Sequence, residues 1–110
     1  MERNPYGKMT HMGRRPKPPP ADYLATNGVW PDGPYTPDAP PYVPRLAYLA
    51  QQLRQEAEER GWSQRALAEA TGVNLNTINY LYAGKVIPDT ATLATLETAL
   101  GITLWPENLI

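Results

Sequence analysis

One stretch, which begins at Ser63, limits the fold of this chain most strongly, because it predicts two short helices joined by a tight turn. Ser63 is placed to cap the first helix, since a serine hydroxyl can accept a backbone N–H two or three residues further on. Gly72 supplies the positive φ that ends this helix. Asn74 then caps the second helix, in which Ile78 and Leu81 share one side and pack onto the first helix.

The second helix of this pair leaves polar side chains on its outward side. The outward positions are Leu75, Asn76, Thr77, Asn79 and Tyr80. Reading the edges of DNA bases requires hydrogen-bonding side chains on the exposed side of a helix whose other side is held in place. We therefore expect this helix to lie in a DNA groove.

A fixed register of residues extends through and beyond this pair of helices. The register comprises Gln64, Ala68, Gly72, Val73, Ile78 and Leu81, followed by Gly84-Lys85, Pro88-Asp89 and an apolar helix that ends at Leu100-Gly101. In these positions the chain resembles the lambda repressor/Cro-like family of bacterial and phage regulators, also called the XRE family, over about residues 44–109. The resemblance implies an all-α fold: a compact domain of four to five helices that binds DNA through its helix-turn-helix.

The resemblance also implies which residues contact DNA. Gln64 begins the first helix of the pair, where a side chain and a helix N-terminus meet a phosphate. Asn76 and Tyr80 occupy the main base-reading positions, and Leu75 before them can press on a thymine methyl group. The expected DNA-binding residues are Gln64, Arg65, Asn74, Leu75, Asn76, Thr77, Asn79, Tyr80, Lys85, Arg14 and Arg15.

Alternatives remain open for several of these residues. Arg65 is equally able to pair with Glu69, which follows four residues later. Tyr80 can pack against the first helix of the domain or against a partner instead of DNA. Asn76 and Asn79 can be solvated side chains.

Proline divides the chain into two parts. Residues 1–43 hold 10 of the 13 prolines and, among leucine, isoleucine and valine, only Leu24, Val29 and Val43. Such a segment buries too little apolar surface to offset its ordering entropy, so we expect an extended, polyproline-like arm over 1–43. The helical domain then occupies 44–110, with helices expected at about 45–60 and 90–100 around the central pair and a short last turn near 106–109.

The arm has features of its own. Residues 1–20 carry a net charge of +4, although the whole chain has −1. The run Gly13-Arg14-Arg15-Pro16-Lys17-Pro18 is loosely similar to the core of a minor-groove AT-hook, and basic arms reach into narrow A·T-rich grooves. The arm is equally well explained as a solubilising tail. Its aromatic residues, Tyr6, Tyr23, Trp30, Tyr35 and Tyr42, can dock on the helical domain or on a partner protein.

Catalysis and metal binding find little support in the sequence. The chain has no cysteine, and its single histidine, His11, lies in the arm. The acidic pair Glu58-Glu59 points to two sides of one helix and does not form a carboxylate dyad. We expect no enzyme activity, no cofactor and no metal site. No apolar run is long enough to span a membrane, and no signal peptide is visible, so a cytoplasmic, nucleoid-associated protein is expected.

Two functions from different classes follow from these observations. The first is a sequence-specific regulator of transcription, expected to be a repressor, that binds double-stranded DNA as a homodimer. The second is a protein-interaction module, antitoxin-like or binding a phage factor, that uses the helical domain and the proline- and tyrosine-rich arm. The absence of arginine and lysine from the second helix of the pair favours the module, whereas the register of the motif favours the regulator.

Overall fold

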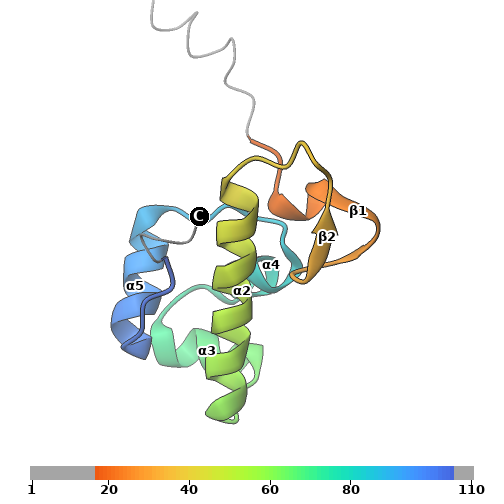
Figure 1. Ribbon diagram of the computed structural model, residues 1–110. Coiled ribbons are helices and arrows are strands. Elements are labelled where there is room, and N and C mark those ends of the chain that lie inside the picture. Colours follow the sequence, from red (N-terminus) through yellow and green to blue (C-terminus); the bar gives the residue numbers. More distant parts are fainter. Residues whose placement is uncertain (1–16, 106–110) are drawn as a thin grey trace, which may run out of the picture.

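The structure, a computed structural model, describes residues 17–105, in which four α-helices enclose one apolar core (Figure 1). Arg14, Arg15 and the last turn expected near 106–109 lie outside the described residues. A 3-10 helix and a two-stranded sheet precede the α-helices. The elements are η1 (Pro20–Tyr23), β1 (Leu24–Val29), β2 (Gly33–Tyr35), α2 (Tyr42–Glu59), α3 (Gln64–Thr71), α4 (Leu75–Ala83) and α5 (Thr90–Leu100).

The long helix α2 forms the centre of the core. Its apolar residues recur every three or four positions, so they share one side of the helix and are buried together. These residues are Val43, Leu46, Ala47, Leu49, Ala50, Leu53 and Ala57. The helix begins at Tyr42, three residues before the expected start, and Pro44 lies in its first turn, where a backbone N–H has no partner within the helix. The ion pair that the four-residue spacing of Glu56 and Arg60 predicts is present at 3.1 Å.

The helix-turn-helix predicted from the sequence is present as α3 and α4. Ser63 caps α3 by accepting the N–H of Ala66 at 3.1 Å, and Gly72 ends α3 with a φ of +81°. Asn74 caps α4 by accepting the N–H of Asn76 at 2.7 Å. Because each cap satisfies backbone groups that the helix itself leaves free, local sequence fixes where both helices begin.

The inward side chains of the shorter helices meet those of α2. Leu67 of α3, Ile78 of α4 and Leu96 of α5 are each 0% exposed. Asp89 caps α5 by accepting the N–H of Thr92 at 2.8 Å, as expected. The predicted all-α body of four to five helices is thus confirmed.

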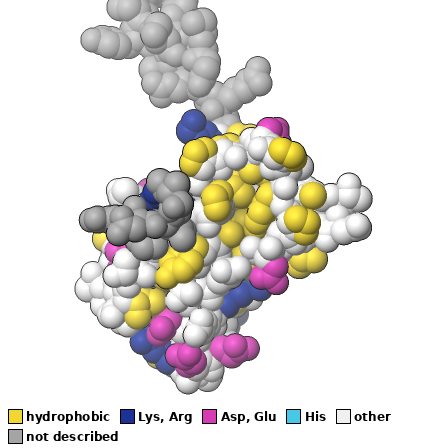
Figure 2. Space-filling model, viewed as in Figure 1, with side chains coloured by type: hydrophobic (Ala, Val, Ile, Leu, Met, Phe, Trp, Pro, Cys, Tyr) yellow, Lys and Arg dark blue, Asp and Glu magenta, His cyan; other side chains and the backbone are white. Residues whose placement is uncertain are grey.

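The N-terminal segment differs from the expected extended arm in residues 17–43. β1 and β2 pair antiparallel, with Leu24 opposite Tyr35 and Val29 opposite Gly33. This hairpin lies against the helical body at the N-terminal end of α2 (Figure 1). Apolar side chains gather over the same region, and several acidic ones cluster toward the far end of α2 (Figure 2). The boundary expected after residue 43 falls inside α2.

Aromatic rings explain why this segment folds back. Trp30 is 8% exposed and belongs to the core, and Tyr35 packs edge-on against it with ring centroids 6.2 Å apart. The Tyr42 hydroxyl donates a hydrogen bond to the carbonyl of Pro18 at 2.6 Å, and Pro20 is buried. The expectation of an arm counted aliphatic residues, but each buried aromatic side chain removes about 150–250 Å² from water. Burial by the rings offsets the shortage of aliphatic side chains.

The hydroxyl of Tyr35 provides a test of the hairpin. It donates to the carbonyl of Pro31 at 2.7 Å, and burial, followed by the charge of Asp32, raises the pKa of Tyr35 from 10.0 to about 12. The folded pKa exceeds the unfolded one, so the neutral phenol stabilises the protein fully below about pH 10, and this contribution is lost as the pH rises toward 12.

An ultraviolet titration of phenolate absorbance measures this effect. We expect the difference between the unmodified protein and Tyr35→Phe to titrate near 12. A difference titrating near 10.0 would show that Tyr35 is solvated and that the hairpin does not pack as described.

Candidate nucleic-acid interface

Helix α4 is held on one side and free on the other. Ile78 and Leu81 are 0% and 3% exposed, so the inward side of the helix is buried in the core. On the opposite side, Asn76 and Asn79 are exposed and Tyr80 is 52% exposed. The structure therefore places the two predicted base-reading residues, Asn76 and Tyr80, and the predicted DNA contact Asn79 together on one accessible surface, which we call the α4 outer face.

The other predicted residues of α4 are less free than expected. Leu75 is partly buried and packs against the core, so only part of its side chain remains outward. Thr77 is half-buried, and the Oδ1 atom of Asn74 is occupied by its capping bond to the Asn76 N–H. The expectation that Leu75 points outward is thus corrected, because the side chain contributes to the closure of the core at the turn.

The start of α3 presents a second accessible edge. Gln64 is half-buried at the first position of the helix, and Arg65 is exposed beside it. Among the described residues 17–105, Arg65 forms no ion pair with Glu69, which was its expected alternative partner. The first N–H groups of a helix point out of its end and favour an anion there.

Two lysines lie close together beyond the end of α4. Lys85 is exposed in the loop that follows the helix, and it lines one depression together with Lys17. Pro19, Val86 and Ile87 form the rest of this depression, which has a volume of about 480 Å³. Lys17, the first described residue, therefore lies on the same depression as Lys85, beyond the end of α4.

The N-terminal segment also holds the C-terminal end of α4. The indole Nε1 of Trp30 donates to the carbonyl of Leu81 at 3.2 Å, and the N–H of Ala21 donates to the carbonyl of Gly84 at 2.9 Å. Gly84 ends the helix with a φ of +71°, and the Trp30 ring lies directly against it. The Leu81 carbonyl also accepts the N–H of Gly84 at 3.3 Å, so the indole adds a second hydrogen bond to a carbonyl at the end of the helix.

Arg54 of α2 supports the same helix end. Its Nη2 atom donates to the carbonyl of Tyr82, and its guanidinium lies 5.2 Å from the centroid of the Tyr82 ring. Burial raises the pKa of Tyr82, an effect that the positive charge of Arg54 partly offsets. A cation at the C-terminus of a helix also interacts favourably with the helix dipole. Spacing along α2 predicts an ion pair of Arg54 with Glu58, and the structure gives the arginine this role instead.

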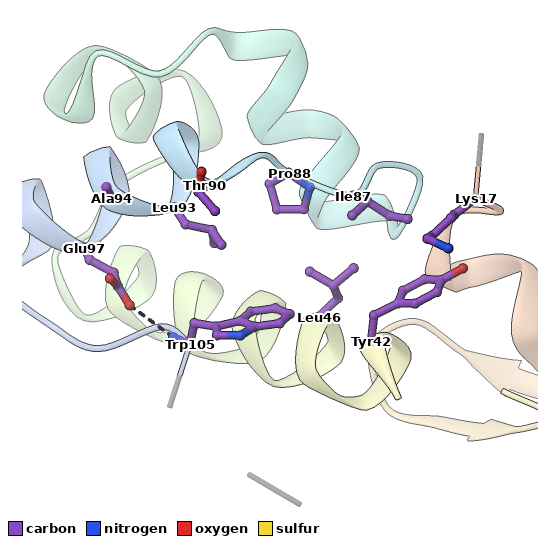
Figure 3. A pocket seen from close by; sticks show the side chains of 10 residues that line it. All are labelled: Lys17, Tyr42, Leu46, Ile87, Pro88, Thr90, Leu93, Ala94, Glu97 and Trp105. Atoms are coloured by element: carbon purple, nitrogen blue, oxygen red, sulfur yellow. Dashed lines mark hydrogen bonds between the residues drawn. The ribbon is translucent and has the colours of Figure 1, made fainter. Parts of the chain in front are cut away.

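An apolar groove lies on another side of the loop that follows α4 (Figure 3). Its volume is about 610 Å³, and Ile87 and Pro88 of the loop face Leu46 of α2 and Trp105 across it. At one end, the Glu97 carboxylate accepts the N–H groups of Leu104 at 2.8 Å and of Trp105 at 3.1 Å. The carboxylate thus fixes the chain that leaves α5 against the groove. Remaining lining residues are Lys17, Tyr42, Thr90, Leu93 and Ala94.

Two further observations concern the described residues as a whole. Among residues 17–105, no cluster of three or more histidine, cysteine, aspartate or glutamate side chains is placed to hold a metal ion. No helix in that part of the chain is long and apolar enough to cross a membrane.

Comparison with known proteins agrees with this architecture. A sequence model of the helix-turn-helix family matches residues 53–104, which include α3, α4 and α5. This part of the chain therefore matches the helix-turn-helix family of the XRE/Cro-C1 type.

The chain is also similar to multiprotein-bridging factor 1 of Schizosaccharomyces pombe, with 30% identity over 61 residues. The match covers 56% of this chain and 41% of the relative, so the chain spans about two fifths of that protein's length.

Sequence reasoning missed the residues that position α4. The sequence marks Trp30 as an aromatic residue able to dock on the body, but its partner, the carbonyl of Leu81, lies 51 residues away. Arg54 shares its helix with several acidic residues, so an ion pair is the simpler expectation. A tryptophan within a proline-rich segment is the one available signal that this segment packs on the core.

Gly84 and Gly72 form a matched pair that tests the contact with Trp30. Both have positive φ values, +71° and +81°, so alanine is strained at either position. A Cβ atom at Gly72 would meet nothing within 4 Å, whereas one at Gly84 would lie 2.5 Å from Cδ2 of Trp30. We expect Gly72→Ala to lower the free energy of unfolding by about 1–2 kcal/mol and Gly84→Ala to lower it substantially more.

A double-mutant cycle then isolates the clash. In the Trp30→Leu background, the cost of Gly84→Ala should fall to about that of Gly72→Ala, because the ring that opposes the new methyl group is gone. Urea unfolding of the single and double variants measures the four values. Equal costs in both backgrounds would show that Trp30 does not pack on the end of α4.

Proposed function

We propose that this protein is a sequence-specific regulator of transcription that binds double-stranded DNA and reads the major groove with the α4 outer face. The observation that carries this proposal is the division of α4 into a buried side and a free polar side that presents Asn76, Asn79 and Tyr80. We assign base reading to Asn76 and Tyr80, and contacts to the DNA backbone to Gln64, Arg65, Thr77 and Lys85. The match to the helix-turn-helix family supports the same docking geometry.

The electrostatics of the domain favour binding as a homodimer. Helix α4 contains no arginine or lysine, and Lys85 lies just beyond its end. One domain therefore neutralises few phosphates and binds weakly, whereas two domains on half-sites about one helical turn apart combine their contacts. We propose that the dimer represses transcription and acts where the DNA is, in the cytoplasm and nucleoid of a bacterial cell, and that it has no catalytic activity.

The second candidate is a protein-interaction module. Its support is the near-neutral α4 outer face, the apolar groove of about 610 Å³ and the similarity to a protein named as a bridging factor. In this alternative, the helical domain and the N-terminal segment bind a protein partner, and α4 has no role in reading DNA.

Asn76→Ala separates the two candidates. The side chain of Asn76 is exposed and makes no hydrogen bond to another residue between 17 and 105, so its loss leaves the fold intact. We expect a gel shift with a selected duplex to show an affinity loss of about 1–3 kcal/mol and relaxed preference at one base pair. Thr98→Ala, at an exposed position of α5, is the matched control and should bind as the unmodified protein does. If both variants bind alike, Asn76 does not read DNA.

Arg14 and Arg15 are proposed to bind phosphates as well, because the segment that they precede enters the structure at Lys17, beside Lys85. Their replacement by glutamine should flatten the plot of log affinity against log salt by about 0.9 for each phosphate that the protein no longer neutralises. Substitution is preferable to deletion of residues 1–20, which would also remove the buried Pro20. The Arg3→Gln/Lys8→Gln double variant removes the same two positive charges and controls for the change in net charge. An unchanged slope in the Arg14/Arg15 variant would exclude both arginines from the interface.

A further inference from the structure

We infer that the α4 outer face selects A·T base pairs at two neighbouring positions of each half-site and contains no side chain that anchors on guanine. This inference rests on the proposed function, because it names the kind of sequence that the same surface reads. Three observations carry it: two free amides, the absence of a cation on the helix, and the spacing of the exposed residues.

The amides of Asn76 and Asn79 are both available for base recognition. Both side chains are exposed, and neither forms a hydrogen bond to another residue between 17 and 105. A carboxamide carries one acceptor and two donors side by side. Adenine presents a matching donor and acceptor, N6 and N7, in the major groove, so asparagine pairs with it bidentately. The surface thus offers two adenine-reading groups.

Guanine lacks a comparable partner on this surface. Its O6 and N7 are both acceptors, and the specific contacts to them come mainly from arginine or lysine. Helix α4 has neither residue between Leu75 and Ala83. Arg54 of α2 is bound to the carbonyl and ring of Tyr82, and Lys85 follows the glycine that ends the helix.

The spacing of the exposed residues sets the distance between the base pairs that they read. Asn79 and Tyr80 follow Asn76 by three and four residues, which is about 4.5–6 Å along a helix. Successive base pairs are about 3.4 Å apart, so contacts from Asn76 and Asn79 fall one or two base-pair steps from each other. The Tyr80 ring, 52% exposed, is placed to meet a thymine methyl group near the second position.

Selection from a random-sequence duplex library with the full chain tests the inference. We expect an enriched half-site with two A·T pairs one or two steps apart as its most invariant positions. An enriched site whose most invariant positions are G·C pairs would overturn the inference and leave the proposed function standing. A library that shows no enrichment over its input would instead remove the proposed function, and the inference with it.

A chemical substitution in the selected duplex shows which asparagine contacts the invariant adenine. Replacing the invariant adenine by 7-deaza-adenine removes the N7 acceptor and should weaken binding of the unmodified protein about 5- to 150-fold. The same replacement should have almost no further effect on Asn76→Ala or on Asn79→Ala, whichever residue reads that base. Thr98→Ala, the control on α5, should remain as sensitive as the unmodified protein. Full sensitivity in both asparagine variants would contradict the inference.

Discussion

The contact between the Trp30 indole and the end of α4 is the interaction on which the rest of the structure depends. Trp30 donates to the Leu81 carbonyl and covers Gly84, while Arg54 binds the carbonyl of Tyr82 from the other helix. Donors from two distant parts of the chain thus complete a helix of nine residues, which is too short to be stable by itself. Since α4 has no positive side chains, the DNA recognition that we propose for it depends on the helix being held in a fixed position.

The helical body was predictable because its signals are local. Ser63, Asn74 and Asp89 each satisfy an N–H group two or three residues away, and Gly72 takes the positive φ that ends α3. Such signals need no knowledge of the rest of the fold. The exposed positions of Asn76, Asn79 and Tyr80 follow from the helical period once the buried side is known.

The N-terminal hairpin and the support of α4 were not predictable in the same way. A low content of leucine, isoleucine and valine indicated an extended segment up to residue 43, but one tryptophan and one tyrosine bury it against the body. The partners of Trp30 and Arg54 are backbone carbonyls 51 and 28 residues away, and a carbonyl carries no mark in the sequence. For Leu75, the helical period alone did not show that the turn needs an apolar side chain to close the core.

Mapping of backbone amide chemical shifts during titration with the selected duplex tests the central claim most directly. The account predicts that the largest changes fall at the start of α3 and along the α4 outer face, at Gln64, Asn76, Asn79, Tyr80 and Lys85. Amides of the hairpin and of the exposed side of α5 should change little. Largest changes on the hairpin or along the groove between α2 and α5, with α4 unaffected, would contradict it.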